Sequence, residues 1–148
     1  MSINDLTELA STASLVDITF AEITARRIER DDPVDGVIPI QPEFEARLQV
    51  REDDGLTIRY HLILNLSVIW GEARVHCVAT YVLPSGILMP ARQLLNEFAN
   101  NVAVMAMVPY VRQALHDVTT KTWPLPILMP TMQRSDLTFS WEDDPEGD

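Results

Sequence analysis

Apolar and polar residues alternate along four segments of the chain, as they do in strands that bury one face of a sheet. The segments are residues 15–28, 44–50, 56–70 and 73–81. The second and third are separated by Asp53-Asp54-Gly55, a turn sequence in which the glycine can adopt a positive φ. Short connections and one polar face per strand predict an antiparallel meander with one side in solvent.

After Pro90 the apolar residues recur every three or four positions, which predicts a helix. Within it, residues 102–111 are all uncharged and apolar, with Pro109 among them. Because a helix turns every 3.6 residues, this run places apolar side chains on every face and must be covered all round. It is too short to cross a bilayer, which takes about 20 residues. Other subunits are therefore the expected cover, and Pro109 is expected to kink the helix because it cannot donate to the helical ladder.

Residues 123–130 are predicted to form an extended apolar loop, because their prolines remove donors that a helix or a central strand needs. Residues 1–14 are polar and rich in Ser and Thr, and we expect a flexible N-terminal arm there. Residues 133–148 are expected to hold a short extended segment and an acidic tail. The fold class is then α+β: one domain, residues 15–132, with a four-stranded antiparallel sheet and a long kinked helix packed on one face.

The charge of the chain restricts its partners. Eleven Lys and Arg stand against 22 Asp and Glu, which gives a net charge of -11. This charge repels phosphate backbones, so it disfavours nucleic acid and anionic membranes and favours a basic partner. Cys77 is the single cysteine, so no intrachain disulfide can form, and the chain does not open with a signal-peptide pattern. We therefore expect a cytoplasmic protein.

Candidate catalytic and metal-binding residues are few. His116 and Asp117 are neighbours, but adjacent residues on a helix do not face each other. His61 and His76 fall on the polar face of neighbouring strands without an evident cross-strand carboxylate, and zinc needs three or four converging ligands. No phosphate-binding glycine loop or nucleophile elbow occurs. We predict no catalytic residue, no metal and no cofactor, and an oligomeric module that binds an apolar ligand between sheet and helix stays open.

Three stretches resemble the SecB family of bacterial export chaperones. DITF at residues 17–20 is similar to the DISF-type opening of the family's first strand. VPYVR at 108–112 is similar to the family's FPYAR helix motif, and TWP…LMP at 122–130 to its TFP…L.P loop. Cys77 falls in the fourth strand, where SecB proteins often carry a cysteine. The resemblance covers roughly residues 15–132.

The resemblance implies a homotetramer, a dimer of dimers whose long helices are sandwiched between two composite sheets. This assembly would explain a helix without a polar face. The expected oligomer interface comprises Val102, Met105, Met107, Val108 and Tyr110.

The resemblance also implies an ATP-independent holdase that keeps preproteins unfolded in apolar grooves and passes them to the motor SecA in protein export. Five loop residues would help to form the client-binding groove, Trp123, Pro124, Leu125, Ile127 and Met129. The same residues could instead cap the core of the oligomer.

The chain departs from the family pattern at two places. No second amphipathic helix follows the loop. Asp17 matches an acidic position that faces SecA in the family, but Ala21 and Val78 stand at the other acidic positions. The expected outer face also carries Arg47, Arg51, Arg59 and Arg74. Some SecB-like proteins serve toxin–antitoxin systems by holding an antitoxin with an exposed apolar extension, and the sequence does not separate this role from export.

Overall fold

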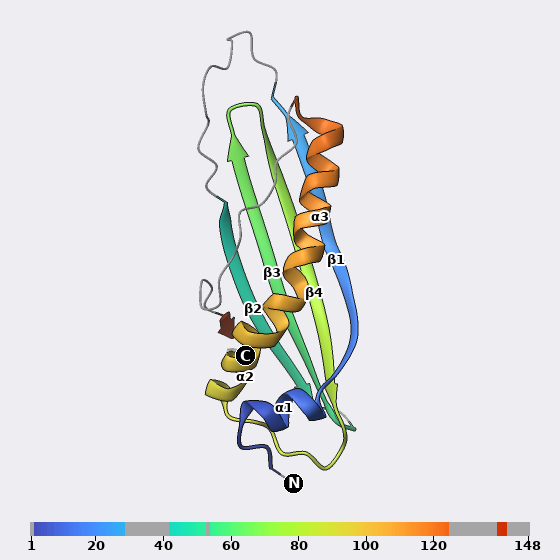
Figure 1. Cartoon of the computed structure of the whole chain (residues 1–148), viewed down its shortest axis with the longest axis vertical. Helices are drawn as coiled ribbons and strands as arrows, with labels where there is room; N and C mark the ends of the chain where they lie inside the picture. The colour runs from blue at the N-terminus through green and yellow to red at the C-terminus, as the bar shows by residue number, and fades with distance from the viewer. Residues whose placement is uncertain (1, 29–41, 53, 125–138, 142–148) are drawn as a thin grey trace.

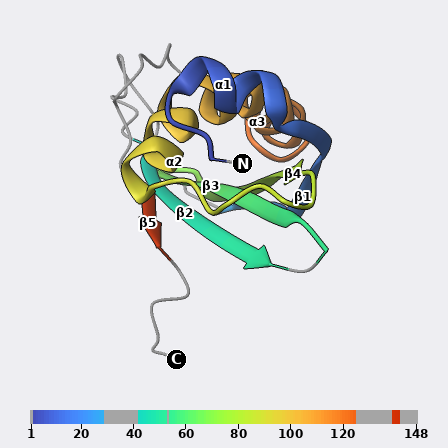
Figure 2. The same ribbon diagram turned by 90° about the horizontal axis from the view of Figure 1, so that it is seen from below.

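The computed structural model describes residues 2–28, 42–52, 54–124 and 139–141 (Figure 1). Their order along the chain is α1 (Leu6–Thr12), β1 (Ser14–Arg27), β2 (Glu43–Glu52), β3 (Leu56–Val68), β4 (Gly71–Leu83), α2 (Arg92–Phe98), a π-helical segment η1 (Ala99–Ala103), α3 (Val104–Thr122) and β5 (Phe139–Trp141). The sheet order is β1-β4-β3-β2-β5, and the helices lie on one side of it (Figure 2).

The four long strands confirm the predicted antiparallel sheet. β3 and β4 pair from Val68 opposite Gly71 to Leu56 opposite Leu83. β2 pairs with β3 along its whole length. Alternate residues of β3 and β4 point into the core, because successive side chains of a strand lie on opposite faces. The buried residues of these two strands in the core cluster are Leu56, Ile58, Tyr60, Leu62, Leu64, Leu66, Ala73, Val75, Cys77, Ala79, Tyr81 and Leu83.

The helical segment packs mainly on β4 and β1 and covers the core face of the sheet. A π-helical turn, Ala99–Ala103, contains Asn100 and Asn101, and the Asn101 side chain donates to the carbonyl of Glu97 at 2.8 Å. Pro109 lies inside α3, with helix on both sides of it. Residues of α3 at three- and four-residue spacing face the sheet and are buried, Val104, Met107, Val111, Leu115 and Thr119. One chain therefore covers one face of this helix and leaves the opposite face to other contacts.

An aromatic cluster joins the helical segment to the sheet. The ring of Phe98 lies 4.9 Å from that of Tyr81 and 5.8 Å from that of Tyr60, measured between centroids. The buried Tyr60 hydroxyl donates to the carbonyl of Leu95 at 3.2 Å, so its polar end is satisfied. Burial raises the pKa of the Tyr60 hydroxyl well above its usual value, so this side chain stays a neutral donor.

The N-terminal residues differ from the flexible arm predicted from the sequence. They form α1, which begins with a capping interaction: the Asp5 carboxylate accepts from the backbone N–H of Glu8 at 2.8 Å. Leu9 is fully buried and Ile3 nearly so. In Figure 2 α1 lies on the same side of the sheet as α2 and α3. Burial of Leu9 stabilises this helix against the core, although most residues of the segment are polar.

The short extended segment predicted within residues 133–148 is present as β5. It pairs with β2 in parallel, with Ala46 opposite Phe139 and Leu48 opposite Trp141. The family's second amphipathic helix would fall largely outside the described residues. No helix in the described part of the chain is long and apolar enough to span a membrane.

Candidate functional site

Trp123, the first residue expected in a client-binding groove, lies in the core instead. Its side chain is 4% exposed, and its indole N–H donates to the carbonyl of Arg26 at 3.1 Å. Its ring meets that of Trp70 edge to face at 6.4 Å. Gly71 is required beside it, because a Cβ there would lie 2.4 Å from the indole nitrogen. The groove prediction is therefore wrong for Trp123, which joins the end of α3 to β1 and β4.

The other predicted groove residues follow Trp123 directly. Pro124 is exposed, whereas Leu125, Ile127 and Met129 lie outside the described residues. Two large apolar residues that the sequence did not single out are exposed at the same end of the sheet, Ile28 and Ile69. Ile28 is held there by its backbone N–H, which donates to the carbonyl of Trp70 at 2.8 Å. This end of the molecule therefore carries exposed apolar surface above a buried tryptophan pair.

The residues expected at an oligomer interface divide between two faces of α3. Met107 is fully buried against the sheet of its own chain, so that prediction is wrong: it shares the inward stripe with Val104 and Val111. Val102, Met105 and Val108 are only partly buried, and Tyr110 is 51% exposed. This outward set is the apolar surface that a second copy could cover.

β1 is an edge strand with large apolar residues in solvent. Val16 is 55% exposed, and Leu15 and Ile23 are more than two-fifths exposed. The register of β1 against β4 shifts between Leu15 and Asp17 and again between Phe20 and Glu22, which breaks the alternation that predicted a half-buried strand. Asp17, the candidate SecA-facing residue, is exposed opposite Thr80. α3 packs against β1 as well as β4, so this helix and the edge strand lie side by side (Figures 1 and 2).

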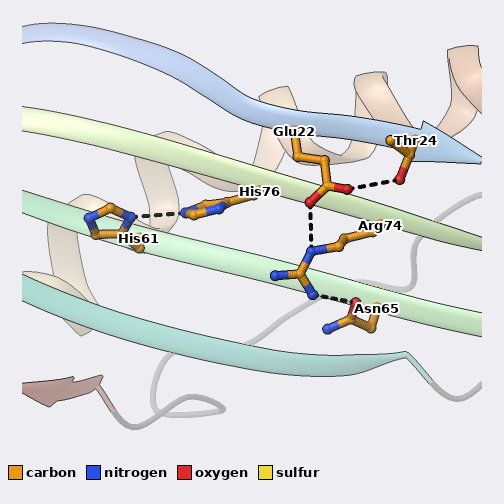
Figure 3. Close-up of polar contacts among 6 residues, drawn as sticks. All are labelled: Glu22, Thr24, His61, Asn65, Arg74 and His76. Atoms are coloured by element: carbon orange, nitrogen blue, oxygen red, sulfur yellow. Dashed lines mark hydrogen bonds and ion pairs between the residues drawn. The ribbon is translucent and has the colours of Figure 1, made fainter. Parts of the chain in front are cut away.

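The opposite, polar face of the sheet carries a hydrogen-bonded network that crosses its strands (Figure 3). Arg74 donates from Nε to Glu22 on β1 and from NH1 to Asn65 on β3, each at 2.8 Å. Arg26 forms an ion pair with Glu72 at the same end of the sheet. Arg74, which the sequence placed on the outer face, is therefore paired within the sheet.

His61 and His76 meet on this polar face, which the sequence did not predict. His61 Nδ1 lies 2.9 Å from His76 Nε2, and His61 Nε2 lies 2.6 Å from the Gln49 carbonyl oxygen. Since that oxygen only accepts, His61 in its neutral form donates from Nε2 and accepts at Nδ1 from His76. Burial lowers the pKa of His76, and Arg47 and Arg74 lower it further. Two antiparallel strands bring the rings together, because residues two apart in register are diagonal neighbours.

The histidines of this network are hydrogen-bonded to each other and to the Gln49 amide. Within the described residues, no group of three or more His, Cys, Asp or Glu side chains is arranged to hold a metal ion. Cys77 is fully buried, and burial raises the pKa of its thiol to about 12. The exposed apolar residues and the strand edges are the candidate interaction surfaces of the described residues.

Comparison with known proteins finds similarity in fold. No protein-family model matches the chain, and no curated protein matches it. Among solved structures, the SecB-like chaperone Rv1957 of Mycobacterium tuberculosis, in complex with a ChAD peptide from the HigA1 antitoxin Rv1956, matches with a TM-score of 0.62. The match has 20% sequence identity and covers 85% of this chain and 95% of that one.

A protein of unknown function from Streptococcus agalactiae matches with a TM-score of 0.54 and 10% identity, over 80% of this chain and 97% of that chain. The predicted α+β, SecB-like fold is thus confirmed: a four-stranded antiparallel sheet with a long helical segment on one face. The resemblance to the SecB family that the sequence carries is borne out at the level of the fold.

Proposed function

We propose that this chain is a cytoplasmic SecB-like chaperone that holds non-native polypeptide without nucleotide or cofactor, and that its principal client is an antitoxin. The observation that carries this proposal is the shared fold with a SecB-like chaperone that was solved with an antitoxin peptide bound. That fold resemblance is joined by the sequence motifs at 17–20, 108–112 and 122–130.

Exposed apolar surface supports a binding role. One copy of the chain leaves large apolar side chains in solvent on β1, on α3 and at the end of the sheet near Trp70. Contiguous exposed apolar patches on a soluble protein mark interaction surfaces, whereas scattered ones are ordinary. β1 and α3 pack side by side, and their exposed apolar residues suit assembly. The proposed client contacts are the exposed residues at the end of the sheet, Ile28 and Ile69, together with Pro124, Leu125, Ile127 and Met129.

Assembly as a homotetramer, a dimer of dimers, belongs to the same proposal. The outward face of α3 and the edge of β1 would form the contacts between copies. Tyr110→Asp places a charge in the middle of the outward face and should shift sedimentation velocity toward smaller species. Gln93→Asp makes the same charge change at an exposed position of α2 and should leave the sedimentation unchanged. If Tyr110→Asp and the unaltered chain sediment identically, the outward face of α3 is not part of the interface.

The polar face of the sheet favours an antitoxin over general export. Export requires delivery of unfolded preproteins to SecA, and the resemblance puts that contact on acidic residues of this face. Here Arg74 and Arg47 stand on the face, paired with Glu22 and Glu45 respectively. The acidic carboxylates are thereby neutralised locally.

Export remains the second candidate because Asp17 is exposed at the expected place. Stoichiometric binding of purified SecA, lost in Asp17→Asn, would favour export over the antitoxin role. A toxin–antitoxin pair encoded beside this chain would favour the antitoxin.

Suppression of aggregation tests the holdase directly. A urea-unfolded client such as luciferase is diluted into buffer with the chain, and light scattering is followed without nucleotide. We expect scattering to fall as the chain approaches stoichiometric amounts. An undiminished signal, together with binding of a small apolar probe, would instead support the module that binds an apolar ligand.

A further inference from the structure

A concavity lies near the turn that joins β2 to β3. Its volume is about 290 Å³, and it is lined by Gln49, Val50, Arg51, Thr57 and Arg59. All of these except Val50 occupy polar-face positions of the two strands. Arg51 stands opposite Thr57 and Arg59 opposite Gln49, so the two exposed arginines are diagonal neighbours. We call this concavity the arginine site.

The charge of the arginine site is opposite to that of the chain as a whole, which carries a net charge of -11. No salt bridge joins Arg59 to another described residue. Asp17 shares its row of the sheet but stands on β1, beyond Thr80 of β4. Arg47 adds a third guanidinium on the same face, paired with Glu45 at 3.0 Å. Like charges on adjacent strands repel each other, so the site favours a bound carboxylate.

β5 runs toward this site. It pairs with β2 in parallel, with Trp141 opposite Leu48, and residues 142–148 follow it directly in the sequence. Five of these seven residues are Asp or Glu. Arg51 lies three residues beyond Leu48 on β2, about 10 Å along the strand at roughly 3.3 Å per residue. Because Asp144 lies three residues beyond Trp141, a tail that continues in the direction of β5 reaches the arginine site.

The register also assigns faces to the carboxylates of such a tail. Ser140 stands opposite Arg47 and so belongs to the polar face. Since successive residues of a strand alternate between faces, an extension of β5 would place Glu142 and Asp144 on this face as well. Asp144 would then stand opposite Arg51, where a carboxylate can accept two guanidinium N–H groups in parallel.

We propose that the arginine site binds an acidic peptide segment, and that its occupant is this chain's own residues 142–148. β5 anchors the tail beside the site, which gives the tail an effective concentration of about millimolar. Several ion pairs contribute together, because one exposed pair stabilises little by itself. The bound tail shields the arginines, so an acidic partner must compete with it. This contact does not require the chaperone function.

Cross-linking locates the tail in the full chain. Arg51→Lys keeps the positive charge and supplies an amine that a carbodiimide joins to a carboxylate in contact with it. Mass spectrometry of the digested chain should find position 51 linked to residues 142–148. The yield should fall at least about fivefold in about 1 M NaCl, where the Debye length is roughly 3 Å. Arg92→Lys is the matched control, exposed on α2 at the helical side of the sheet (Figure 2), and should give no link to the tail.

Three cross-linking results would overturn the site. They are the absence of a link between position 51 and the tail, a yield that salt does not change, and a yield no higher than that of Arg92→Lys. A link that joins only different copies, in a mixture of isotope-labelled and unlabelled chains, would assign the site to another copy's tail and overturn the intramolecular contact.

Competition with a peptide measures how fully the tail occupies the site. The probe is a fluorescein-labelled peptide with the sequence of residues 142–148. The host is the full chain with its acidic tail residues changed to amides, Glu142→Gln, Asp143→Asn, Asp144→Asn, Glu146→Gln and Asp148→Asn. This variant should bind the probe about tenfold more tightly than the unaltered chain does, if the tail occupies the site for about nine-tenths of the time.

Arginine variants of the amide-tailed chain show where the probe binds. Arg51→Gln combined with Arg59→Gln should abolish the gain in affinity. Arg26→Gln combined with Arg92→Gln removes the same charge at exposed positions elsewhere and should keep it. Equal affinity of the unaltered and amide-tailed chains, or equal loss in the two double variants, would overturn the proposal. The suppression of client aggregation is measured separately, so either result leaves the chaperone function standing.

Discussion

Replacing Trp123 tests whether this side chain belongs to the core or to a client-binding groove. Trp123→Ala removes a side chain that is 4% exposed, its hydrogen bond to Arg26 and its ring contact with Trp70. Truncating a buried tryptophan to alanine costs about 3–5 kcal/mol of unfolding free energy. A domain of this size has roughly 5–15 kcal/mol in total, so the alanine variant should lose a large share of its stability.

Trp123→Phe is the more informative change, because it keeps an aromatic ring and removes the indole donor. The carbonyl of Arg26 then loses its partner in a part-buried site, which costs about 1 kcal/mol or somewhat more. With a urea dependence of about 2 kcal/mol per molar, the unfolding midpoint should fall by roughly 0.5 M or somewhat more. Far-UV circular dichroism in urea measures this midpoint, at one fixed concentration because assembly adds to apparent stability.

Gly71 offers a check on the geometry of the same contact. A Cβ at this position would lie 2.2 Å from the carbonyl oxygen of Arg26 and 2.4 Å from the Trp123 indole nitrogen. Gly71→Ala should therefore destabilise the chain, and by less when Trp123 is already Ala, with a coupling of about 0.5–3 kcal/mol. The reasoning is refuted if Trp123→Ala unfolds at the same urea concentration as the unaltered chain but loses client binding.

Two further predictions concern titratable groups. Because burial, Arg47 and Arg74 lower the pKa of His76 below its ordinary value of about 6.5, the folded chain binds this proton more weakly than the unfolded chain does, and stability should fall as the pH drops below about 6.5. Thermal midpoints between pH 7.5 and 5 should show a smaller loss in His76→Gln, and identical pH profiles would contradict this origin. The Cys77 thiol, fully buried with a pKa of about 12, should react with a thiol reagent at pH 8 only after unfolding in urea, so rapid labelling of the folded chain would contradict its placement.

The sheet was predictable because its signals are local. Period-two alternation marks each strand, and the short connection between β3 and β4 fixes the register that pairs them. The same register would have predicted the meeting of His61 and His76, since it places the two rings at diagonal positions. Asp5-Leu6-Thr7-Glu8 also has the spacing of a capping box, the signal that could have predicted α1.

The sequence could not assign the faces of α3 or the place of Trp123. An uncharged run shows that a helix will be covered, but Met107 and Tyr110 differ only in which side meets the sheet of their own chain. Trp123 lies next to an apolar loop in sequence, whereas its partners Arg26 and Trp70 are distant in sequence and meet it only after the sheet and helix pack. Long-range packing of this kind leaves no periodic signal in the chain.

Sedimentation velocity with a fluorescent unfolded client tests the chaperone role most directly. The full chain is mixed with a labelled, urea-unfolded polypeptide that is diluted into nucleotide-free buffer, and the labelled boundary is followed. The account predicts that the label moves as one soluble complex, larger than the chain's own assembly and stable at stoichiometric amounts. A label that pellets as aggregate while the chain sediments alone and unchanged would contradict it.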